Sequence, residues 1–147
     1  MKHFIKPDLF TIIVSALCII LLIYTSVRLI QYPTWHRIVI LALLFLSFSF
    51  FAIKMPLYTY VGQNEIIVKQ LIGSKNFKRN DISTQRISST DMKGTIRLFG
   101  SGGFLGYIGW FDNVKLGKFY MIITSKKDLL LITTATGKKY VINCPDD

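Results

Sequence analysis

The side chains that could carry out chemistry are few in this 147-residue chain, and their spacing argues against catalysis. The two histidines, His3 and His36, lie on either side of a long apolar run. The segment after Met55 has one glutamate, Glu65, and no pair of carboxylates at helical or strand spacing for acid–base work. No histidine–cysteine cluster has the spacing of a metal site. We therefore expect no enzymatic activity, no catalytic residue, no cofactor and no metal.

The remaining reactive groups have simpler explanations. Cys144 has no sequence-level base partner, which favours a structural thiol. Ser125 and Lys126 are adjacent, and because adjacent side chains of a strand point to opposite faces, this pair is typical of a turn. Cys18 lies in an apolar run, so we expect no internal disulfide, which suits a reducing compartment.

The most unusual stretch is Phe99–Phe111, FGSGGFLGYIGWF, in which five glycines are interspersed with aromatic residues. It lacks the glycine spacing of a dinucleotide-binding loop, and no Gly-Lys-Ser/Thr follows for a nucleotide phosphate loop. Two interpretations stay open: a loop that presents aromatic anchors to a membrane or partner, or a tight crossing with its aromatics folded into the core. We expect a positive φ at Gly102 or Gly103, because adjacent glycines between aromatics suggest such a turn. The candidate interaction loop comprises Phe99, Gly100, Gly102, Gly103, Phe104, Gly106, Tyr107, Gly109, Trp110 and Phe111.

The basic residues give a formal net charge of +10 and are scattered along the chain. No recognition helix, zinc knuckle or stacking motif accompanies them, so we expect no nucleic-acid partner; we also expect no small-molecule substrate. One group follows the second apolar run and could approach an anionic surface, although an ordinary solvated turn would have the same composition. These candidate contacts are Lys69, Lys75, Lys78 and Arg79.

Two apolar runs near the N-terminus must position everything that follows. Leu9–Val27 and Ile38–Ile53 contain no charged residue, and as helices they would span about 28 Å and about 24 Å. Neither run has the polar face that a helix of a soluble domain needs. No small-x-small cleavage site precedes Arg28, which argues against a cleaved signal peptide. We predict a two-span transmembrane hairpin over residues 1–56, with spans at about 9–28 and 38–54.

An even number of spans places both termini on one side of the membrane. The basic residues near the spans are nearly balanced between the two sides. The domain after Met55 has thirteen lysines and arginines against seven acidic residues, a net charge of +6. We expect an integral protein of the inner or plasma membrane, with the lipid bilayer as a partner and the C-terminal domain in the cytoplasm.

From residue 57 onward the pattern changes to short β-branched and aromatic runs separated by Gly, Asn and Ser. Seven or eight such runs at spacings of roughly ten residues indicate an antiparallel barrel or sandwich. The predicted strands are Leu57–Val61, Glu65–Ile72, Lys75–Lys78, residues 81–87, Thr95–Phe99, Lys118–Thr124, Leu129–Thr134 and Lys138–Asn143. We predict a single β domain over residues 57–147 with no helix outside the membrane.

The order TIRLFGSGGFLGYIGWFDNVKLGKFYMIITSKKDLLLI, followed by a GKKYVIN strand, resembles bacterial pleckstrin-homology-like (PH-like) domain proteins, in which two membrane spans often precede a small β domain. The resemblance covers residues 57–147 and is strongest over Thr95–Ile132. It implies a membrane α-helical hairpin followed by a mostly-β, PH-like antiparallel barrel or sandwich of about seven strands. Two bent, nearly orthogonal sheets would be closed at one corner by a C-terminal helix.

The closing helix is where this chain departs from the family. Pro145-Asp146-Asp147 is how such a helix would begin, since proline suits a first turn and aspartates favour a helix N-terminus, but the sequence then stops. We therefore expect the helix to be absent and apolar side chains to be uncovered where it would pack. The candidates are Ile66, Val68, Ile122, Leu130 and Val141.

These observations predict a membrane-anchored, non-enzymatic binding or scaffolding module that engages a protein partner or a second copy of the chain. Two alternatives stay open. One is a structural subunit of a membrane complex, in which Phe45, Phe48 and the Ser47/Ser49 pair pack against other spans. The other is a module that binds an anionic lipid surface.

Overall fold

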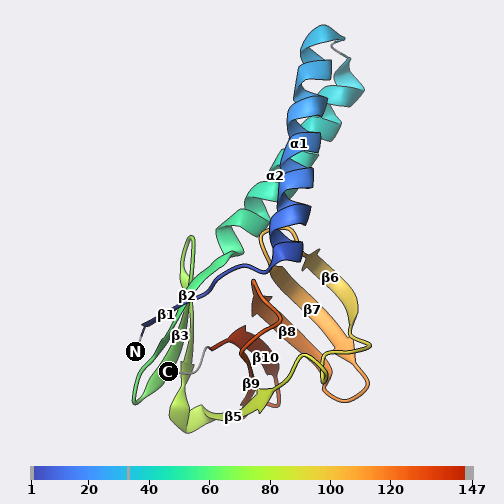
Figure 1. Cartoon of the computed structure of the whole chain (residues 1–147). Helices are drawn as coiled ribbons and strands as arrows, with labels where there is room; N and C mark the ends of the chain where they lie inside the picture. Colours follow the sequence, from blue (N-terminus) through green and yellow to red (C-terminus); the bar gives the residue numbers. More distant parts are fainter. Residues whose placement is uncertain (1, 33, 145–147) are drawn as a thin grey trace.

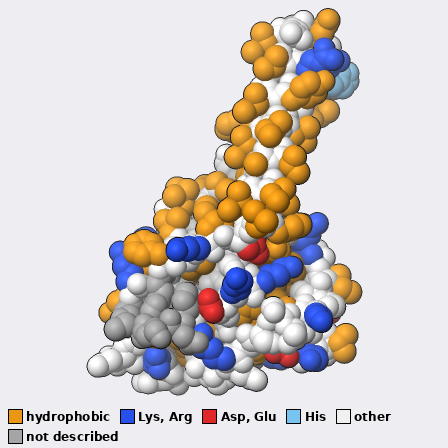
Figure 2. All heavy atoms as spheres, in the orientation of Figure 1, with side chains coloured by type: hydrophobic (Ala, Val, Ile, Leu, Met, Phe, Trp, Pro, Cys, Tyr) orange, Lys and Arg blue, Asp and Glu red, His pale blue; other side chains and the backbone are white. Residues whose placement is uncertain are grey.

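The computed structural model describes residues 2–32 and 34–144, and it shows two long helices extending as a stalk from a two-sheet β domain (Figure 1). Helices α1 (Leu9–Gln31) and α2 (Trp35–Lys54) pack side by side. Both are long and apolar enough to cross a membrane, and hydrophobic side chains cover the visible face of the stalk (Figure 2). The predicted hairpin of two apolar helices is therefore confirmed.

The ends of the helices follow from capping and charge. The Asp8 carboxylate accepts a hydrogen bond from the Thr11 backbone N–H at 2.8 Å, which caps the first turn of α1. Arg28 lies in the last turn of α1 and Lys54 in the last turn of α2. A cation in either place stabilises the negative end of the helix dipole.

The β domain consists of a smaller and a larger sheet. The smaller has the order β1-β2-β3-β4, and the larger has the order β5-β9-β10-β8-β7-β6. The strands of the smaller sheet are β1 (Lys2–Phe4), β2 (Pro56–Val61), β3 (Glu65–Gln70) and β4 (Ser74–Lys78). A 3-10 turn, η1 (Arg79–Asp81), leads to the larger sheet. Its strands are β5 (Ile82–Ile87), β6 (Ile96–Gly102), β7 (Tyr107–Asn113), β8 (Gly117–Ile123), β9 (Leu129–Thr134) and β10 (Lys139–Asn143).

The predicted fold, a helical hairpin followed by a PH-like sandwich, is confirmed, with three differences in detail. Nine strands follow the helices instead of about seven, because Phe99–Phe111 belongs mainly to strands β6 and β7. Strands β8 and β10 pair in parallel within an otherwise antiparallel sheet. Strand β1, which we did not predict, pairs with β2, and its Lys2 ammonium lies 4.3 Å from the centre of the Tyr58 ring.

The predicted exposure of apolar residues at the site of a closing helix is wrong. Among residues 2–32 and 34–144 no helix follows β10, as expected, and residues 145–147, whose composition suits the start of such a helix, lie outside the described residues. The five candidate lining residues are nevertheless buried: the two sheets cover Ile66, Val68, Ile122 and Leu130, and Val141 is buried in the core on the other face of the larger sheet. The exposed fractions are 2% for Ile66, 0% for Val68, 1% for Ile122, 8% for Leu130 and 0% for Val141.

The core has two parts, one on each face of the larger sheet. The part between the sheets contains Ile66, Val68, Phe77, Ile122, Leu130, Ile132, Ile142 and Cys144. The second part contains Ile87, Met92, Tyr107, Phe111, Phe119, Met121, Ile123, Leu129, Leu131 and Val141. Met92 comes from the segment between β5 and β6, so this connection covers part of the second face of the larger sheet.

Candidate functional site

The glycine–aromatic segment forms a hairpin whose glycines permit the close approach of two strands. Gly100 of β6 lies opposite Gly109 of β7, with φ angles of 122° and 141°. A Cβ on Gly109 would lie 2.1 Å from the Phe99 carbonyl oxygen, and one on Gly100 would lie 2.2 Å from the Ile108 carbonyl oxygen. Both contacts are with backbone, which cannot move aside as a side chain can. Only glycine therefore fits at the centre of this hairpin.

The tip of the hairpin, residues 103–106, packs against the two helices. The Leu105 backbone N–H donates a hydrogen bond of 2.9 Å to the Ser15 hydroxyl of α1. The Phe104 ring lies 4.4 Å from the Phe48 ring of α2, measured between centroids. The predicted positive φ is confirmed at Gly103, where φ is 143°. The tip therefore fastens the β domain to the base of the stalk.

A cavity of about 570 Å³ opens beside this hairpin, on the second face of the larger sheet. Its floor includes Tyr107 and Phe111 of β7 and Met121 of β8, all of which belong to the core. The other lining residues are Ser89, Met92, Lys93, Gly94, Thr95, Arg97, Gly102 and Lys126. Three of the lining residues are therefore cations and none is acidic.

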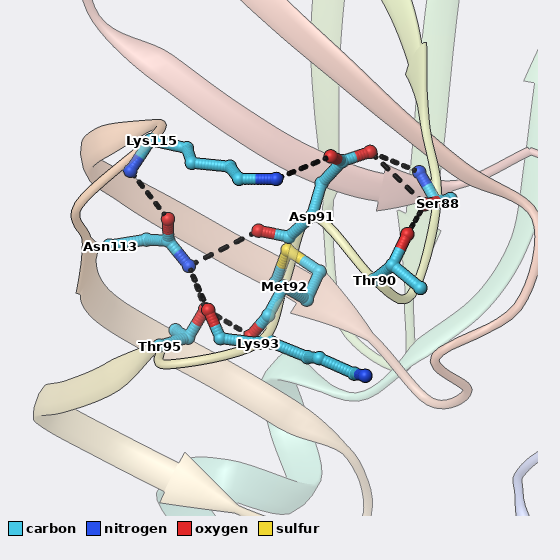
Figure 3. A network of polar contacts seen from close by, with 8 residues as sticks. All are labelled: Ser88, Thr90, Asp91, Met92, Lys93, Thr95, Asn113 and Lys115. Atoms are coloured by element: carbon cyan, nitrogen blue, oxygen red, sulfur yellow. Dashed lines mark hydrogen bonds and ion pairs between the residues drawn. The ribbon is translucent and has the colours of Figure 1, made fainter.

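Asn113 fixes the wall of this cavity that is formed by the connection between β5 and β6 (Figure 3). Its side-chain nitrogen donates to the Asp91 carbonyl oxygen at 3.2 Å, the Lys93 carbonyl oxygen at 3.0 Å and the Thr95 hydroxyl at 2.8 Å. Its side-chain oxygen accepts a hydrogen bond of 2.8 Å from the Lys115 backbone N–H. One 4%-exposed amide thus uses its donors and its acceptor to hold this connection against the β7–β8 turn.

The Asp91 carboxylate organises the opposite end of the same connection (Figure 3). It accepts hydrogen bonds of 3.0 and 3.1 Å from the Ser88 backbone N–H and hydroxyl, and it lies 3.4 Å from the Lys115 ammonium. The Ser88 hydroxyl also contacts the Thr90 hydroxyl. The hydrogen bonds from Ser88, followed by Lys115, lower the pKa of Asp91. This carboxylate is therefore ionised and already engaged.

Asn143 fixes a second element of the cavity, the turn between β8 and β9. Its side-chain nitrogen donates to the Ser125 and Lys127 carbonyl oxygens at 2.8 and 2.7 Å. Its side-chain oxygen accepts a hydrogen bond of 2.9 Å from the Thr124 backbone N–H. The turn that Asn143 holds carries Lys126 to the rim of the cavity.

Tyr107 connects the cavity to the first turn of α1. Its ring stacks against Phe10 with centroids 6.4 Å apart, and the Lys126 ammonium lies 4.8 Å from the centre of the Tyr107 ring. Burial, followed by the negative charge of Asp8, raises the pKa of Tyr107 to about 12. The Tyr107 hydroxyl is therefore neutral at physiological pH.

Strand β6 forms the open edge of the larger sheet, next to the cavity. Ile96, Leu98 and Phe99 are 67%, 52% and 69% exposed. A bulge between Arg97 and Phe99 places Arg97 opposite Phe111, on the cavity side of the sheet. Phe99 lies on the other side, where it forms one end of an aromatic row.

The aromatic row runs across the strands on the opposite face from the cavity. Phe99 lies opposite Trp110, and the Trp110 ring is 5.3 Å from the Tyr120 ring between centroids. Tyr120 in turn is 6.2 Å from Tyr140. Exposure decreases along this row, from 69% at Phe99 to 41% at Trp110 and partial burial at the two tyrosines.

The residues of the candidate interaction loop are thus divided among four environments. Gly103, Phe104 and Gly106 lie in the tip that packs on the helices, and Gly100 and Gly109 lie at the centre of the hairpin. Gly102, Tyr107 and Phe111 line the cavity. Phe99 and Trp110 are exposed on the face opposite the cavity.

The four candidate anionic-surface residues do not form one patch. Lys69 and Lys75 lie near the turn between β3 and β4. Lys78 lies opposite Glu65 at the other end of this hairpin, and Arg79 follows it in η1. Three to four residues along these strands separate the two pairs by about 10–13 Å.

The sequence analysis did not single out Asn113, Asn143, Arg97 or Lys126 as parts of one site. The two asparagines lie at the ends of strands β7 and β10, where an amide can replace missing ladder hydrogen bonds, but this signal is common to many turns. Their combined role depends on which loops the fold brings beside them.

Two apolar helices carrying a PH-like β sandwich define the class: a helix-anchored PH-type domain in which the β6–β7 hairpin is joined to the stalk. Residues 58–147 match the family model described as bacterial PH domain, and the chain belongs to this family. No curated protein and no solved structure matches the chain.

Proposed function

We propose that this protein is a membrane-anchored, non-catalytic binding module whose PH domain takes up an extended segment of a partner protein along strand β6. The observation that carries this proposal is the open, apolar edge of β6 beside a cavity with a basic rim. An exposed sheet edge binds an extended peptide through main-chain hydrogen bonds, while neighbouring pockets select its side chains.

The geometry of β6 indicates the pattern that the partner segment should have. Alternate side chains of an added strand would point toward the cavity, on the side of Arg97, and toward the exposed aromatic face, on the side of Phe99. The first set meets the basic rim and the second set meets apolar groups. We therefore expect a segment that alternates acidic and apolar residues.

The charges of the cavity support an acidic ligand. Among residues 2–32 and 34–144 no carboxylate forms an ion pair with Lys93, Arg97 or Lys126. Arg97 extends toward Gly102, since a Cβ there would lie 2.8 Å from a guanidinium nitrogen. The partner's carboxylates would therefore find cations that are not neutralised within the described chain.

The stalk supports the location of this binding at a membrane. The hairpin tip holds the β domain to α1 and α2, so β6 would lie close to the bilayer surface if the helices cross it. We place the domain in the cytoplasm, on the same side as the N-terminus. A cysteine at exposed Thr136, introduced with both native cysteines replaced by serine, should react with an impermeant thiol reagent only after lysis; reaction in intact cells would reverse this orientation.

Photocrosslinking in cells tests the partner proposal on the full chain. A photoreactive amino acid at Ile96 should give an adduct that maps to an extended segment with alternating acidic and apolar residues. Arg97→Glu and Leu98→Lys should each lower its yield at least tenfold, by charge reversal and by edge protection. Val114→Lys is the matched control, because Val114 is 101% exposed in the turn after β7.

Two results would contradict the proposal. One is the absence of any protein adduct from Ile96, and the other is an adduct whose yield both variants leave unchanged. The same reagent at Leu46, which is 70% exposed on α2, tests the alternative of a structural subunit recognised within the lipid. Adducts from Leu46 alone would favour that alternative.

A further inference from the structure

We infer that the crevice between α1 and α2 near their connecting turn binds one acidic phospholipid, with the lipid phosphate between Arg28 and Arg37. This inference rests on the membrane crossing in the proposed function, but not on the protein partner. It concerns the end of the stalk that lies farthest from the β domain (Figure 2).

The crevice combines an apolar interior with two cations. It has a volume of about 210 Å³ and lies between Tyr24 and Arg28 of α1 and Arg37, Ile40 and Leu44 of α2. Ile40 follows Arg37 by three residues and Leu44 follows Ile40 by four, so all three lie on the same face of α2, with the two aliphatic residues nearer the middle of the helix. A phosphate at the guanidinium groups would therefore leave an attached acyl chain beside these aliphatic side chains.

Both guanidinium groups are held at the crevice, and within residues 2–32 and 34–144 most of their donors have no acceptor. The Arg28 Nε donates to the Tyr24 hydroxyl at 3.2 Å, and one terminal nitrogen of Arg37 donates to the Tyr32 carbonyl oxygen at 3.2 Å. A guanidinium has five N–H donors in a planar fork that matches phosphate oxygens. Each arginine can therefore keep its present contact and still bind an anion.

No acidic group of the described chain neutralises this pair. The sequence has no aspartate or glutamate between Asp8 and Glu65. Asp8 caps the opposite end of α1, which at 1.5 Å per residue is about 30 Å from Arg28. Two cations at one crevice repel each other, so an anion placed between them is favoured by charge complementarity.

The depth of the pair selects a lipid as the anion. Arg28 directly follows the apolar run of α1, and Arg37 directly precedes that of α2. With these runs in the hydrocarbon core, both guanidinium groups lie at the level of the phospholipid headgroups. Basic pockets between transmembrane helices on the cytoplasmic side bind acidic headgroups in this way. In the orientation proposed above this crevice lies in the opposite leaflet, so its ligand is an acidic phospholipid of that leaflet.

Native mass spectrometry of the full-length protein in detergent tests the site. The probe is phosphatidylglycerol, compared with phosphatidylcholine of the same acyl chains and with soluble glycerol phosphate. We expect one phosphatidylglycerol to be retained, at least tenfold more tightly than phosphatidylcholine, and little binding of glycerol phosphate because it lacks the acyl chains. Tight binding of glycerol phosphate would instead indicate a free-anion site and overturn the assignment to a lipid.

Two variants separate this site from general charge attraction. The double variant Arg28→Gln/Arg37→Gln should lower phosphatidylglycerol affinity at least tenfold, whereas Lys6→Gln/Lys54→Gln removes the same charge at the other end of the stalk and should change it less than twofold. Leu44→Trp fills the crevice without altering charge and should also weaken binding.

Equal losses in the two double variants, or unchanged binding in Arg28→Gln/Arg37→Gln, would overturn the inference. A circular dichroism spectrum of each variant confirms that the helices remain folded. Photocrosslinking from Ile96 reports the partner proposal separately, so the failure of either proposal is visible without the other.

Discussion

Replacing Asn143 with alanine should loosen the turn that connects the cavity to the stalk. The Asn143 side chain is 1% exposed and makes three hydrogen bonds of 2.7–2.9 Å to residues 124, 125 and 127. At about 1 kcal/mol of net stabilisation for each, the loss should be about 3 kcal/mol, a large part of the stability of a typical domain. The Thr124 backbone N–H would also be left buried without its acceptor.

The loss should extend from the turn to the first turn of α1. The Thr124 carbonyl oxygen accepts hydrogen bonds of 3.1 Å from both the Asp8 backbone N–H and the Thr11 hydroxyl. When the turn opens, these two contacts open with it. Hydrogen exchange of the full-length protein in detergent should therefore show about 100-fold faster exchange in a peptide covering residues 121–128, and a smaller increase at the start of α1.

The isosteric variant Asn143→Asp separates hydrogen bonding from packing. Its second carboxylate oxygen would face the Ser125 and Lys127 carbonyl oxygens, which are both acceptors, so the folded state should favour the protonated acid. The pKa of this aspartate should thus lie above the unfolded value of about 3.9. The folded state then holds a proton that the unfolded state loses, and the stability of the variant should fall as the pH rises from 4 to 7.

Asn76→Ala is the matched control, because Asn76 is an exposed asparagine on strand β4. Its exchange and thermal unfolding should be close to those of the original protein. If Asn143→Ala exchanges within twofold of Asn76→Ala over residues 121–128, the hydrogen bonds of Asn143 do not hold this turn. A flat pH dependence of Asn143→Asp stability would refute the electrostatic part of the reasoning.

Three further predictions concern the hairpin and its contacts. Gly109→Ala should lower the free energy of unfolding by about 3 kcal/mol or more, because the new Cβ would lie 2.1 Å from a backbone oxygen. In Gly137→Ala the Cβ would meet nothing within 4 Å, so this control should cost only about 1 kcal/mol; similar melting temperatures for the two variants would contradict the prediction. Ser15→Ala should speed hydrogen exchange at the hairpin tip about fivefold, since it removes the hydrogen bond to Leu105 and such a bond contributes about 1 kcal/mol. The control Ser49→Ala, whose hydroxyl donates to the Phe45 carbonyl oxygen of the same helix, should not; equal exchange rates in the two variants would show that the Ser15 contact does not stabilise the tip. Because the pKa of Tyr107 is raised to about 12, its contribution to stability should be lost as the pH rises from 10 through 12, and Tyr107→Phe should remove this part of the alkaline destabilisation; an unchanged profile would argue against the raised pKa.

Much of the fold follows from local patterns in the sequence. Two charge-free runs predict two helices, because only a helix satisfies the backbone of an apolar segment of that length in lipid. Alternating and β-branched runs predict most strands, since each periodicity reports which faces are buried. A positive φ near Gly103 was also predictable, because glycine has no Cβ and adopts positive φ angles that other residues avoid.

The division of Phe99–Phe111 into two strands was not predictable from the same patterns. Glycine has no side chain to pack and usually indicates a turn, so the segment looked like a loop. In the structure, Gly100 and Gly109 face each other because their strands approach too closely for any Cβ. That requirement comes from the pairing of two segments, which a single sequence does not display.

The cavity is a property of tertiary structure alone. Asn113 and Asn143 act on loops about twenty residues away in the sequence, and Arg97 reaches the cavity face only because a bulge sets its register. By contrast, the cations at the turn of the stalk are visible in the sequence as the borders of the apolar runs. Local composition therefore determined the helices, most strands and the charge, whereas the site depended on long-range hydrogen bonds and strand register, which are fixed only when distant segments pack together.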